Sequence, residues 1–295
     1  MGIISIILEV IISLSLLFLQ APFSVENNVN IYSLNSHNLN LYYKVDNNSL
    51  NDISADKIKI IGNNDVSYLE QREEEKQAIA SITKLMTALV FLDNEPNLNE
   101  VYTISEDDTI DGGKRHFFIG EKIKLSDILK AALIASDNEA AAILSQVNGL
   151  EKDEFIKLMN KKAIELGMLN TQFVDSTGLN KGNISTASDV SILFKEAFNN
   201  ELIKEALSIP EYSFETLQGR EKKITSTDYS VFNENINYLG GKTGYTDEAD
   251  YCLVSSFRVS EEEDIIVVVL NSDSKEGRFS ESMELTQIIR DKYYK

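Results

Sequence analysis

The chain has few of the residues on which disulfides, metal sites and histidine-based catalysis depend. Its 295 residues include a single cysteine, Cys252, so no disulfide can form within the chain. The two histidines, His37 and His116, belong to no His-Glu-x-x-His pattern, so we expect no metal site, and we expect no cofactor either. A Ser-His-Asp triad would have to be built on one of these two residues.

Positive charge is also scarce, because 28 Lys and Arg stand against 47 Asp and Glu and the net charge is −19. Binding of nucleic acid requires a basic face, so no nucleic-acid partner is expected. An anionic substrate would need a locally basic site within an acidic surface. The hydrophobic fraction of 43% is enough for a substantial core, which argues against a disordered chain.

The first residues predict export. The run from Ile3 to Leu19 is apolar except for serines and Glu9, and no Lys or Arg precedes it. Its length is marginal for a membrane span and slightly long for a signal-peptide core. We expect residues 1–21 to be a signal peptide or an N-terminal membrane anchor, with membrane attachment through residues 3–19 if they are retained. Residues 22–56 are rich in Asn and Ser and are predicted to be a tether.

The remaining residues, 57–295, are predicted to form one α/β domain. Strands at both ends of this region and a helical middle favour a mostly antiparallel sheet with helices on both faces. Ser126 is the predicted N-cap of one helix, and Gly167 the predicted stop of another. The predicted strands cover residues 57–61, 66–70, 211–217, 222–227, 251–259 and 265–270. The predicted helices cover residues 81–93, 128–135, 139–147, 151–166, 188–198, 201–208 and 278–293.

The first chemical motif is Ser81-Ile82-Thr83-Lys84, at the start of a predicted helix. A serine hydroxyl needs a positioned base to become a nucleophile, and residues three apart share a helix face. Lys84 must be neutral to act as that base, and burial, a helix N-terminus or a neighbouring cation would lower its pKa. The pattern alone is not specific, because residues 272–275 also read Ser-x-x-Lys in a predicted loop.

Two further motifs follow. Ser136-Asp137-Asn138 lies between two predicted helices, where a hydroxyl and an amide could relay a proton and hold a carbonyl; otherwise its serine is a helix cap. Lys242-Thr243-Gly244 follows two glycines and is predicted to start a strand. Its glycine permits close backbone approach, and Lys242 and Thr243 can bind a carboxylate; otherwise it is a hairpin corner. The order and spacing of the three motifs are more specific than any one of them.

With these motifs in this order, the chain resembles the low-molecular-mass penicillin-binding proteins of the D-alanyl-D-alanine carboxypeptidase family. The resemblance covers roughly Lys57 to the C-terminus. It implies a β-lactamase/transpeptidase-like fold for residues 57–295 and an extracytoplasmic location in the cell envelope. The matching stretches are Ile79–Thr87, Ala135–Ala140, Leu166–Phe173, Gly178-Leu179, Ser185–Asp189, Gly241–Thr246 and Gly277-Arg278.

The resemblance also implies catalytic roles. Ser81 would attack the carbonyl of the penultimate D-Ala of a peptidoglycan stem peptide, and Lys84 would take its proton. Ser136 would pass a proton to the departing amine, with Lys242 and Asn138 completing the network. Water would then release the acyl-enzyme. A β-lactam imitates the D-Ala-D-Ala end and should acylate Ser81.

A second set of positions would bind the substrate. By the same resemblance, Thr243 and Arg278 would hold the terminal carboxylate beside Gly244. The oxyanion would lie between the backbone N–H groups of Ser81 and Tyr245. Loss of one such donor typically lowers the rate about a hundredfold or more.

The sequence departs from the family pattern at several points. Asp137 and Asp250 stand where glycine is common in the family, and the N-terminal hairpin lacks the usual Asp-x-x-Thr-Gly turn. With no second β-domain or C-terminal amphipathic anchor expected, the chain resembles the single-domain endopeptidase branch. Carboxypeptidase and endopeptidase activity both stay open.

Other interpretations remain. A class A β-lactamase shares the three motifs but needs a deacylating glutamate, and Glu165 is one residue away from the required position. A peptidoglycan-binding homologue without catalysis is a further alternative. A thiol hydrolase built on Cys252 and His116, or a serine hydrolase with His116 as base, is disfavoured. We expect Cys252 to lie in the core and His116 in an exposed loop, and no Gly-x-Ser-x-Gly elbow is present.

Overall fold

The computed structural model describes residues 50, 52–110, 113–233 and 236–294, all in one compact unit. The predicted signal or anchor segment, residues 1–21, and the tether up to residue 49 lie outside the described residues. Within the described ranges, no helix has the length and apolar character needed to cross a membrane.

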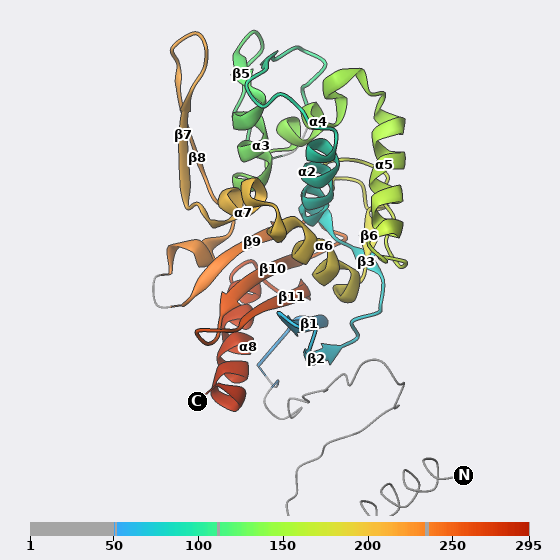
Figure 1. Cartoon of the computed structure of the whole chain (residues 1–295), viewed down its shortest axis with the longest axis vertical. Helices are drawn as coiled ribbons and strands as arrows, with labels where there is room; N and C mark the ends of the chain where they lie inside the picture. The colour runs from blue at the N-terminus through green and yellow to red at the C-terminus, as the bar shows by residue number, and fades with distance from the viewer. Residues whose placement is uncertain (1–49, 51, 111–112, 234–235, 295) are drawn as a thin grey trace, which may run out of the picture. The chain divides into compact units, whose positions relative to one another are not determined.

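A five-stranded sheet joins strands from both ends of the described chain (Figure 1). All of its neighbouring strands are antiparallel, in the order β2-β1-β11-β10-β9, and Lys57 of β1 lies opposite Leu270 of β11. This arrangement confirms the predicted fold class. The strands are β1 (Lys57–Gly62), β2 (Ser67–Gln71), β9 (Tyr238–Gly244), β10 (Tyr251–Arg258) and β11 (Asp264–Ser272).

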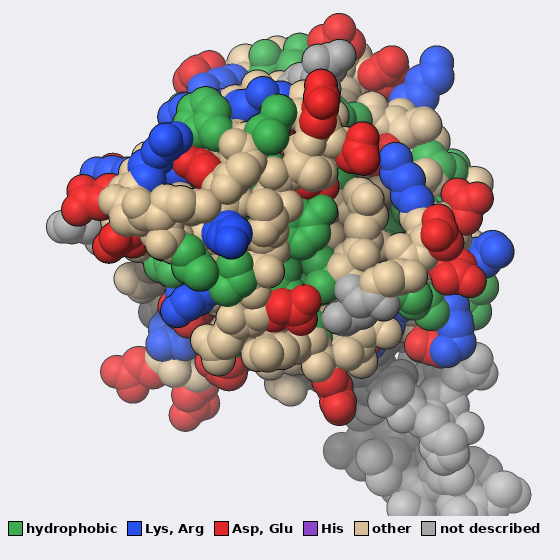
Figure 2. Space-filling model, turned by 90° about the horizontal axis from the view of Figure 1, so that it is seen from above, with side chains coloured by type: hydrophobic (Ala, Val, Ile, Leu, Met, Phe, Trp, Pro, Cys, Tyr) green, Lys and Arg blue, Asp and Glu red, His purple; other side chains and the backbone are tan. Residues whose placement is uncertain are grey.

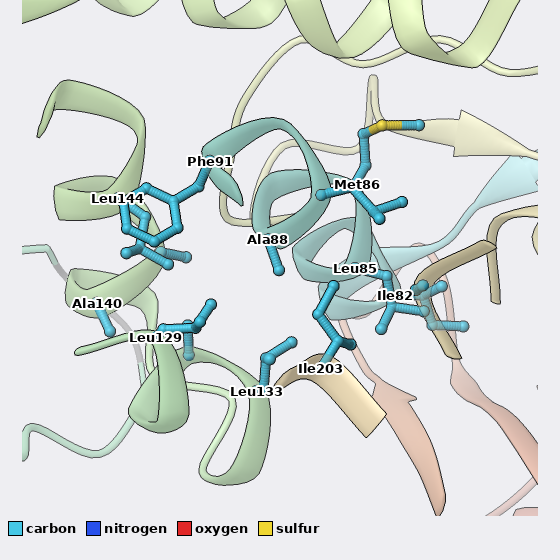
Figure 3. Packing of buried hydrophobic residues seen from close by; sticks show 14 of the residues in the cluster. Ile82, Leu85, Met86, Ala88, Phe91, Leu129, Leu133, Ala140, Leu144 and Ile203 are labelled. Atoms are coloured by element: carbon cyan, nitrogen blue, oxygen red, sulfur yellow. The ribbon is translucent and has the colours of Figure 1, made fainter. Parts of the chain in front are cut away.

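Helices cover both faces of this sheet (Figure 1), with α8 on one face and α6 on the other. Within the helical half, every side chain of α2 from Thr83 to Phe91 is buried. Figure 3 shows Ala88 and Phe91 of α2 facing Leu129 and Leu144 of the neighbouring helices. The helices are α2 (Thr83–Asp93), α3 (Leu125–Ile134), α4 (Asn138–Gln146), α5 (Lys152–Glu165), α6 (Ala187–Asn199), α7 (Glu201–Ser208) and α8 (Gly277–Tyr293).

The central strand β11 divides its side chains between two cores. Val267 and Val269 pack with Phe279 of α8, whereas Val268 and Leu270 belong to the core on the opposite face. Because successive strand side chains point to opposite faces, a strand buried on both faces needs an unbroken apolar run. That requirement explains why β11 reads Ile-Ile-Val-Val-Val-Leu rather than alternating with polar residues.

Shorter elements position the loops of the site. Three 3₁₀ helices occur in the described chain: η2 (Ala80–Ile82), η3 (Val147–Gly149) and η4 (Tyr229–Phe232). Three two-stranded sheets complete the described elements. They pair β3 (Gln77–Ala78) with β6 (Ile184–Ser185), β4 (Val101–Thr103) with β5 (Lys122–Lys124), and β7 (Glu211–Glu215) with β8 (Glu221–Thr225).

Two predicted helix starts were wrong by more than one residue. Helix α3 begins at Leu125 rather than after a cap at Ser126, because the backbone N–H groups of both residues donate to carbonyls of the loop between α2 and β4. The predicted helix 81–93 begins as the 3₁₀ helix η2 and becomes α-helical only at Thr83.

The third motif lies at the end of strand β9, not at the start of a strand as predicted. The two glycines before Lys242 were expected to precede the strand. The strand instead begins at Tyr238, opposite Phe257, and continues through Gly240 and Gly241 with a register shift. Glycine inside a strand commonly marks such an irregularity.

Packing begins before Lys57, where we expected the folded region to start. The Ser54 N–H donates to Glu281 Oε1 of α8 at 2.9 Å, and Ala55 is buried. This segment therefore lies against the last helix.

Candidate active site

Ser81 and Lys84 are in direct contact at the junction of η2 and α2. Lys84 Nζ lies 2.8 Å from Ser81 Oγ, the contact expected from their spacing. Ala80 adopts a left-handed conformation (φ 46°) just before Ser81, which turns the chain from β3 into η2. Ser81 is half-buried, while Lys84 is fully buried. The Ser81 hydroxyl can therefore contact a substrate on its exposed side and the Lys84 amine on its buried side.

Two further oxygens surround the Lys84 amine. Nζ lies 2.8 Å from Asn138 Oδ1 and 2.6 Å from the Thr177 carbonyl oxygen, and both oxygens act only as acceptors. A neutral amine has two N–H groups and one lone pair. If the two N–H groups bond to these acceptors, the lone pair is left for the Ser81 hydroxyl. The surroundings thus fit a neutral Lys84 acting as base.

The pKa values of the two site lysines are displaced in the direction that this role requires. Burial lowers the pKa of Lys84 to about 7, although the negative charges of Asp137 and Asp175 act in the opposite direction. The pKa of Lys242 is lowered well below its usual value, first by burial and then by the positive charges of Lys84 and Arg278. At neutral pH a substantial share of Lys84 therefore lacks its extra proton.

The second motif forms the turn between α3 and α4. Ser136 is in the left-handed region (φ 56°), which costs a non-glycine residue about 1–2 kcal/mol, a kind of strain that collects at functional sites. The helix cap is Asp137, not Ser136, because its Oδ1 accepts from the Ala140 N–H at 2.8 Å. The turn places Asn138 against Lys84 and leaves the Ser136 hydroxyl facing the third motif.

The third motif closes the site from strand β9. Lys242 Nζ donates to Ser136 Oγ at 2.8 Å, and Thr243 Oγ1 lies 2.7 Å from Thr227 Oγ1. A Cβ atom at Gly244 would lie 2.7 Å from the Ile79 carbonyl oxygen. The absence of a side chain at Gly244 therefore lets the end of β9 lie against η2.

Arg278 and Tyr245 lie beyond the end of this strand. Arg278 is 4% exposed, and its Nη1 donates to the Gly244 carbonyl at 2.9 Å. Its Nε is buried without an acceptor among the described residues. Tyr245 is 48% exposed and stacks on Tyr251, with the ring centroids 4.5 Å apart.

The loop that supplies the Thr177 carbonyl was not predicted from the sequence. Asp175 Oδ1 accepts from the N–H groups of Thr177 and Gly178 at 2.6 Å each, and Asn183 Nδ2 ties the loop to Thr83 Oγ1 at 3.0 Å. A Cβ atom at Gly178 (φ 87°) would overlap the Ala80 carbonyl oxygen. The Asp-x-Thr-Gly sequence is a turn signal. It does not indicate that the carbonyl of this turn reaches Lys84.

The prediction that His116 would be exposed was wrong. Its side chain is 8% exposed, and Nδ1 lies 2.7 Å from Asp137 Oδ2. His116 therefore braces the second motif from outside the reacting groups. Cys252 is buried as predicted, and burial raises its pKa to about 11, which disfavours a reactive thiolate.

Glu165, the candidate β-lactamase glutamate, is exposed on α5 and pairs with Lys161 at 3.1 Å. The carboxylates whose charges act on Lys84 are those of Asp137 and Asp175, and each already accepts backbone hydrogen bonds that fix its own turn. None of these three carboxylates fits the role of driving a rapid deacylation.

The site as a whole can perform acyl transfer. It combines a nucleophile with its base, a second hydroxyl–lysine pair and a buried guanidinium. Arg278 supplies a buried positive charge in an acidic protein, whereas Asp and Glu are interspersed with Lys and Arg over the face seen in Figure 2. Within the described ranges, no group of three or more His, Cys, Asp or Glu could hold a metal ion.

Known proteins resemble this chain in both sequence and structure. The family model described as D-alanyl-D-alanine carboxypeptidase matches residues 44–274. A D-alanyl-D-alanine endopeptidase of Pseudomonas aeruginosa is 37% identical over 213 residues, which are 70% of this chain and 67% of that protein. One of Haemophilus influenzae is 40% identical over 181 residues, 60% of this chain and 61% of that protein.

A D-alanyl-D-alanine carboxypeptidase of Bacillus subtilis is 33% identical over 213 residues, 70% of this chain and 54% of that protein. This chain therefore spans about half to two thirds of the length of these relatives. The crystal structure of the Streptomyces K15 DD-transpeptidase is similar with a TM-score of 0.75 and 25% identity. The similarity covers 80% of this chain and 97% of that one.

Proposed function

Because this chain belongs to the D-alanyl-D-alanine carboxypeptidase family, we propose that it is a serine D,D-peptidase that cleaves D-Ala-D-Ala ends or cross-links of peptidoglycan stem peptides. The observation that carries the proposal is the pair of lysine–serine contacts. Lys84 lies 2.8 Å from Ser81 Oγ, and Lys242 lies 2.8 Å from Ser136 Oγ. β-Lactams, which imitate the D-Ala-D-Ala end, are the proposed inhibitors.

Acylation starts at Ser81. Its oxygen forms a bond to the carbonyl carbon of the penultimate D-Ala while its proton moves to Lys84. The backbone N–H groups of Ser81 and Tyr245 would hold the oxyanion. The carbon–nitrogen bond then breaks, and the departing amine takes a proton through Ser136, which Lys242 holds in place. Water adds to the resulting ester, restores the Ser81 hydroxyl and releases the acid.

Arg278 and Thr243 are the proposed partners of the substrate carboxylate. A buried N–H without an acceptor costs about 1–3 kcal/mol, and Arg278 Nε is in that situation within the described residues. A carboxylate bound beside Gly244 would remove this cost. The expected result is that substrates with a free carboxylate on the leaving residue bind better than their amides.

Because two of these relatives are named endopeptidases, cross-links are the first candidate substrate for this protein. Carboxypeptidase activity on a terminal D-Ala is the second candidate. We further place the protein in the extracytoplasmic cell envelope, because peptidoglycan lies there. Residues 3–19 would export it or attach it to the membrane, since their run of apolar side chains is interrupted only by serines and Glu9.

The substrate assignment is tested with a stem pentapeptide ending in D-Ala-D-Ala, a cross-linked peptide dimer and penicillin. We expect cleavage of at least one peptide by chromatography, together with a penicillin adduct that persists much longer than one peptide turnover. Rapid release of hydrolysed penicillin would instead indicate a β-lactamase. Peptide binding with neither cleavage nor adduct would indicate an inactive binding homologue.

The pH dependence of acylation follows from Lys84. Only the neutral amine can accept the Ser81 proton, so the second-order rate constant for penicillin acylation should rise with pH and level off above about 7. Since the charge of Asp137 raises the pKa of Lys84, Asp137→Asn should move the midpoint to lower pH. A profile that is flat from pH 5 to 9, or a midpoint that moves upward in the variant, would contradict this role of Lys84.

A further inference from the structure

Two aromatic rings lie near the buried guanidinium of Arg278, and a more exposed tyrosine ring packs against each of them. Its Cζ lies 5.6 Å from the Tyr251 ring, on which Tyr245 stacks. Cζ also lies 4.7 Å from the Phe279 ring, whose centroid is 5.4 Å from that of Tyr229. Tyr229 and Tyr245 are each 48% exposed, although rings of this size usually bury most of their surface.

A cation accompanies one of these rings. Lys275 Nζ donates to Tyr229 Oη at 2.9 Å and lies 4.6 Å from the ring centroid. It forms no ion pair with any described carboxylate, in a chain whose net charge is −19. Lys275 lies in the turn before α8, and the Tyr229 and Phe279 rings connect it to Arg278.

The position of these groups relative to the reacting bond follows from the proposed function. If Arg278 and Thr243 hold the carboxylate of the leaving residue, the side chains on the far side of Arg278 lie near the part of the substrate that departs with the amine. Tyr229 belongs to η4, which begins two residues after Thr227, the contact of Thr243. Tyr245 directly follows Gly244, whose carbonyl accepts from Arg278.

We propose that Tyr229, Tyr245, Tyr251 and Lys275, here called the aromatic shelf, form a binding site for the leaving peptide of a cross-link. This inference rests on the proposed function and specifies its substrate side. A carboxypeptidase releases a single D-alanine, which Arg278 and Thr243 suffice to hold. An enzyme that splits a cross-link must also hold a second stem peptide.

The chemistry of the shelf fits a peptide that carries carboxylates. Aromatic faces bind aliphatic chain, while Lys275 supplies the charge for a carboxylate. A neutral sugar would use the rings without needing the cation. Cross-linked peptides without sugar therefore suffice as ligands in the test.

The test compares kcat and KM for a sugar-free cross-linked dimer and for the monomeric pentapeptide. We expect Tyr229→Ala and Lys275→Ala to raise KM for the dimer about tenfold, with kcat for the dimer unchanged. Both constants for the pentapeptide, and the rate of penicillin acylation, should stay within about twofold. Tyr229→Phe keeps the ring and should raise KM for the dimer less than Tyr229→Ala does.

Lys292→Ala is the matched control, because Lys292 also lies over a tyrosine ring but near the other end of α8. It should change kcat and KM for neither substrate. An equal rise in KM for the dimer and the pentapeptide would overturn the aromatic shelf. An unchanged KM for both substrates would overturn it too, as would a rise in KM confined to substrates that carry sugar. If the wild-type protein cleaves neither peptide, the proposed function fails and the shelf with it. If it cleaves them and the variants match it, the shelf alone fails.

Discussion

Replacing Lys84 by glutamine is expected to lower the rate of Ser81 acylation by penicillin at least about a thousandfold. Glutamine can still bond to Asn138 and to the Thr177 carbonyl, but it cannot accept the serine proton. Loss of a group that acts as a unit with its nucleophile removes most of the catalysis, because the remaining parts have no base to work with. The measurement is the second-order acylation rate with a fluorescent penicillin.

Lys84→Arg is the informative companion. A guanidinium keeps the positive charge but does not lose its proton in proteins. If Lys84 acts as a base, arginine should be as inactive as glutamine. An arginine variant that retains a tenth or more of the wild-type rate would show that the positive charge is what matters, and would contradict the proposed role. The thermal unfolding midpoint of each variant is the check that loss of rate does not reflect loss of fold.

The second large effect concerns the nucleophile itself. Ser81→Ala should abolish peptide cleavage, with a loss of about ten-thousandfold or more. The fold should survive, since Ser81 is half-buried and alanine leaves Lys84 with its two other acceptors. Stem peptide should still bind, because the proposed carboxylate contacts at Thr243 and Arg278 remain.

Ser272→Ala is the matched control for that variant, because Ser272 begins the other Ser-x-x-Lys pattern. In the structure Ser272 ends β11 and is buried, and Lys275 contacts Tyr229 instead. Cleavage should persist in this variant. Substantial cleavage by Ser81→Ala itself would remove Ser81 from the mechanism.

The fold was largely predictable because its elements have simple patterns. The apolar run of β11 and the periodic apolar residues of α2 each predict one type of element. The element boundaries were less predictable where backbone hydrogen bonds to a distant loop, rather than a side-chain cap, fix the start of a helix, as at Ser126. The start of β9 was also predicted too late in the sequence, because Gly240 and Gly241 lie inside the strand rather than before it.

The side-chain chemistry of the site was predictable, whereas its backbone chemistry was not. Ser81, Lys84 and Lys242 are recognised by residue type and spacing. The Thr177 carbonyl meets Lys84 across 93 positions of sequence, and a backbone oxygen has no residue-type signature. Conformation can still explain a departure from the family pattern. Asp250 adopts a left-handed conformation (φ 51°), which is the geometry that glycine tolerates best.

The central claim, an acyl-enzyme on Ser81, is tested most directly by intact mass. The protein from residue 50 onward is incubated with penicillin, and the modified peptide is then identified by proteolysis. The account predicts a gain of one penicillin mass, located on Ser81 and absent from Ser81→Ala. A stable adduct on any other residue, or an equal adduct on Ser81→Ala, would contradict it.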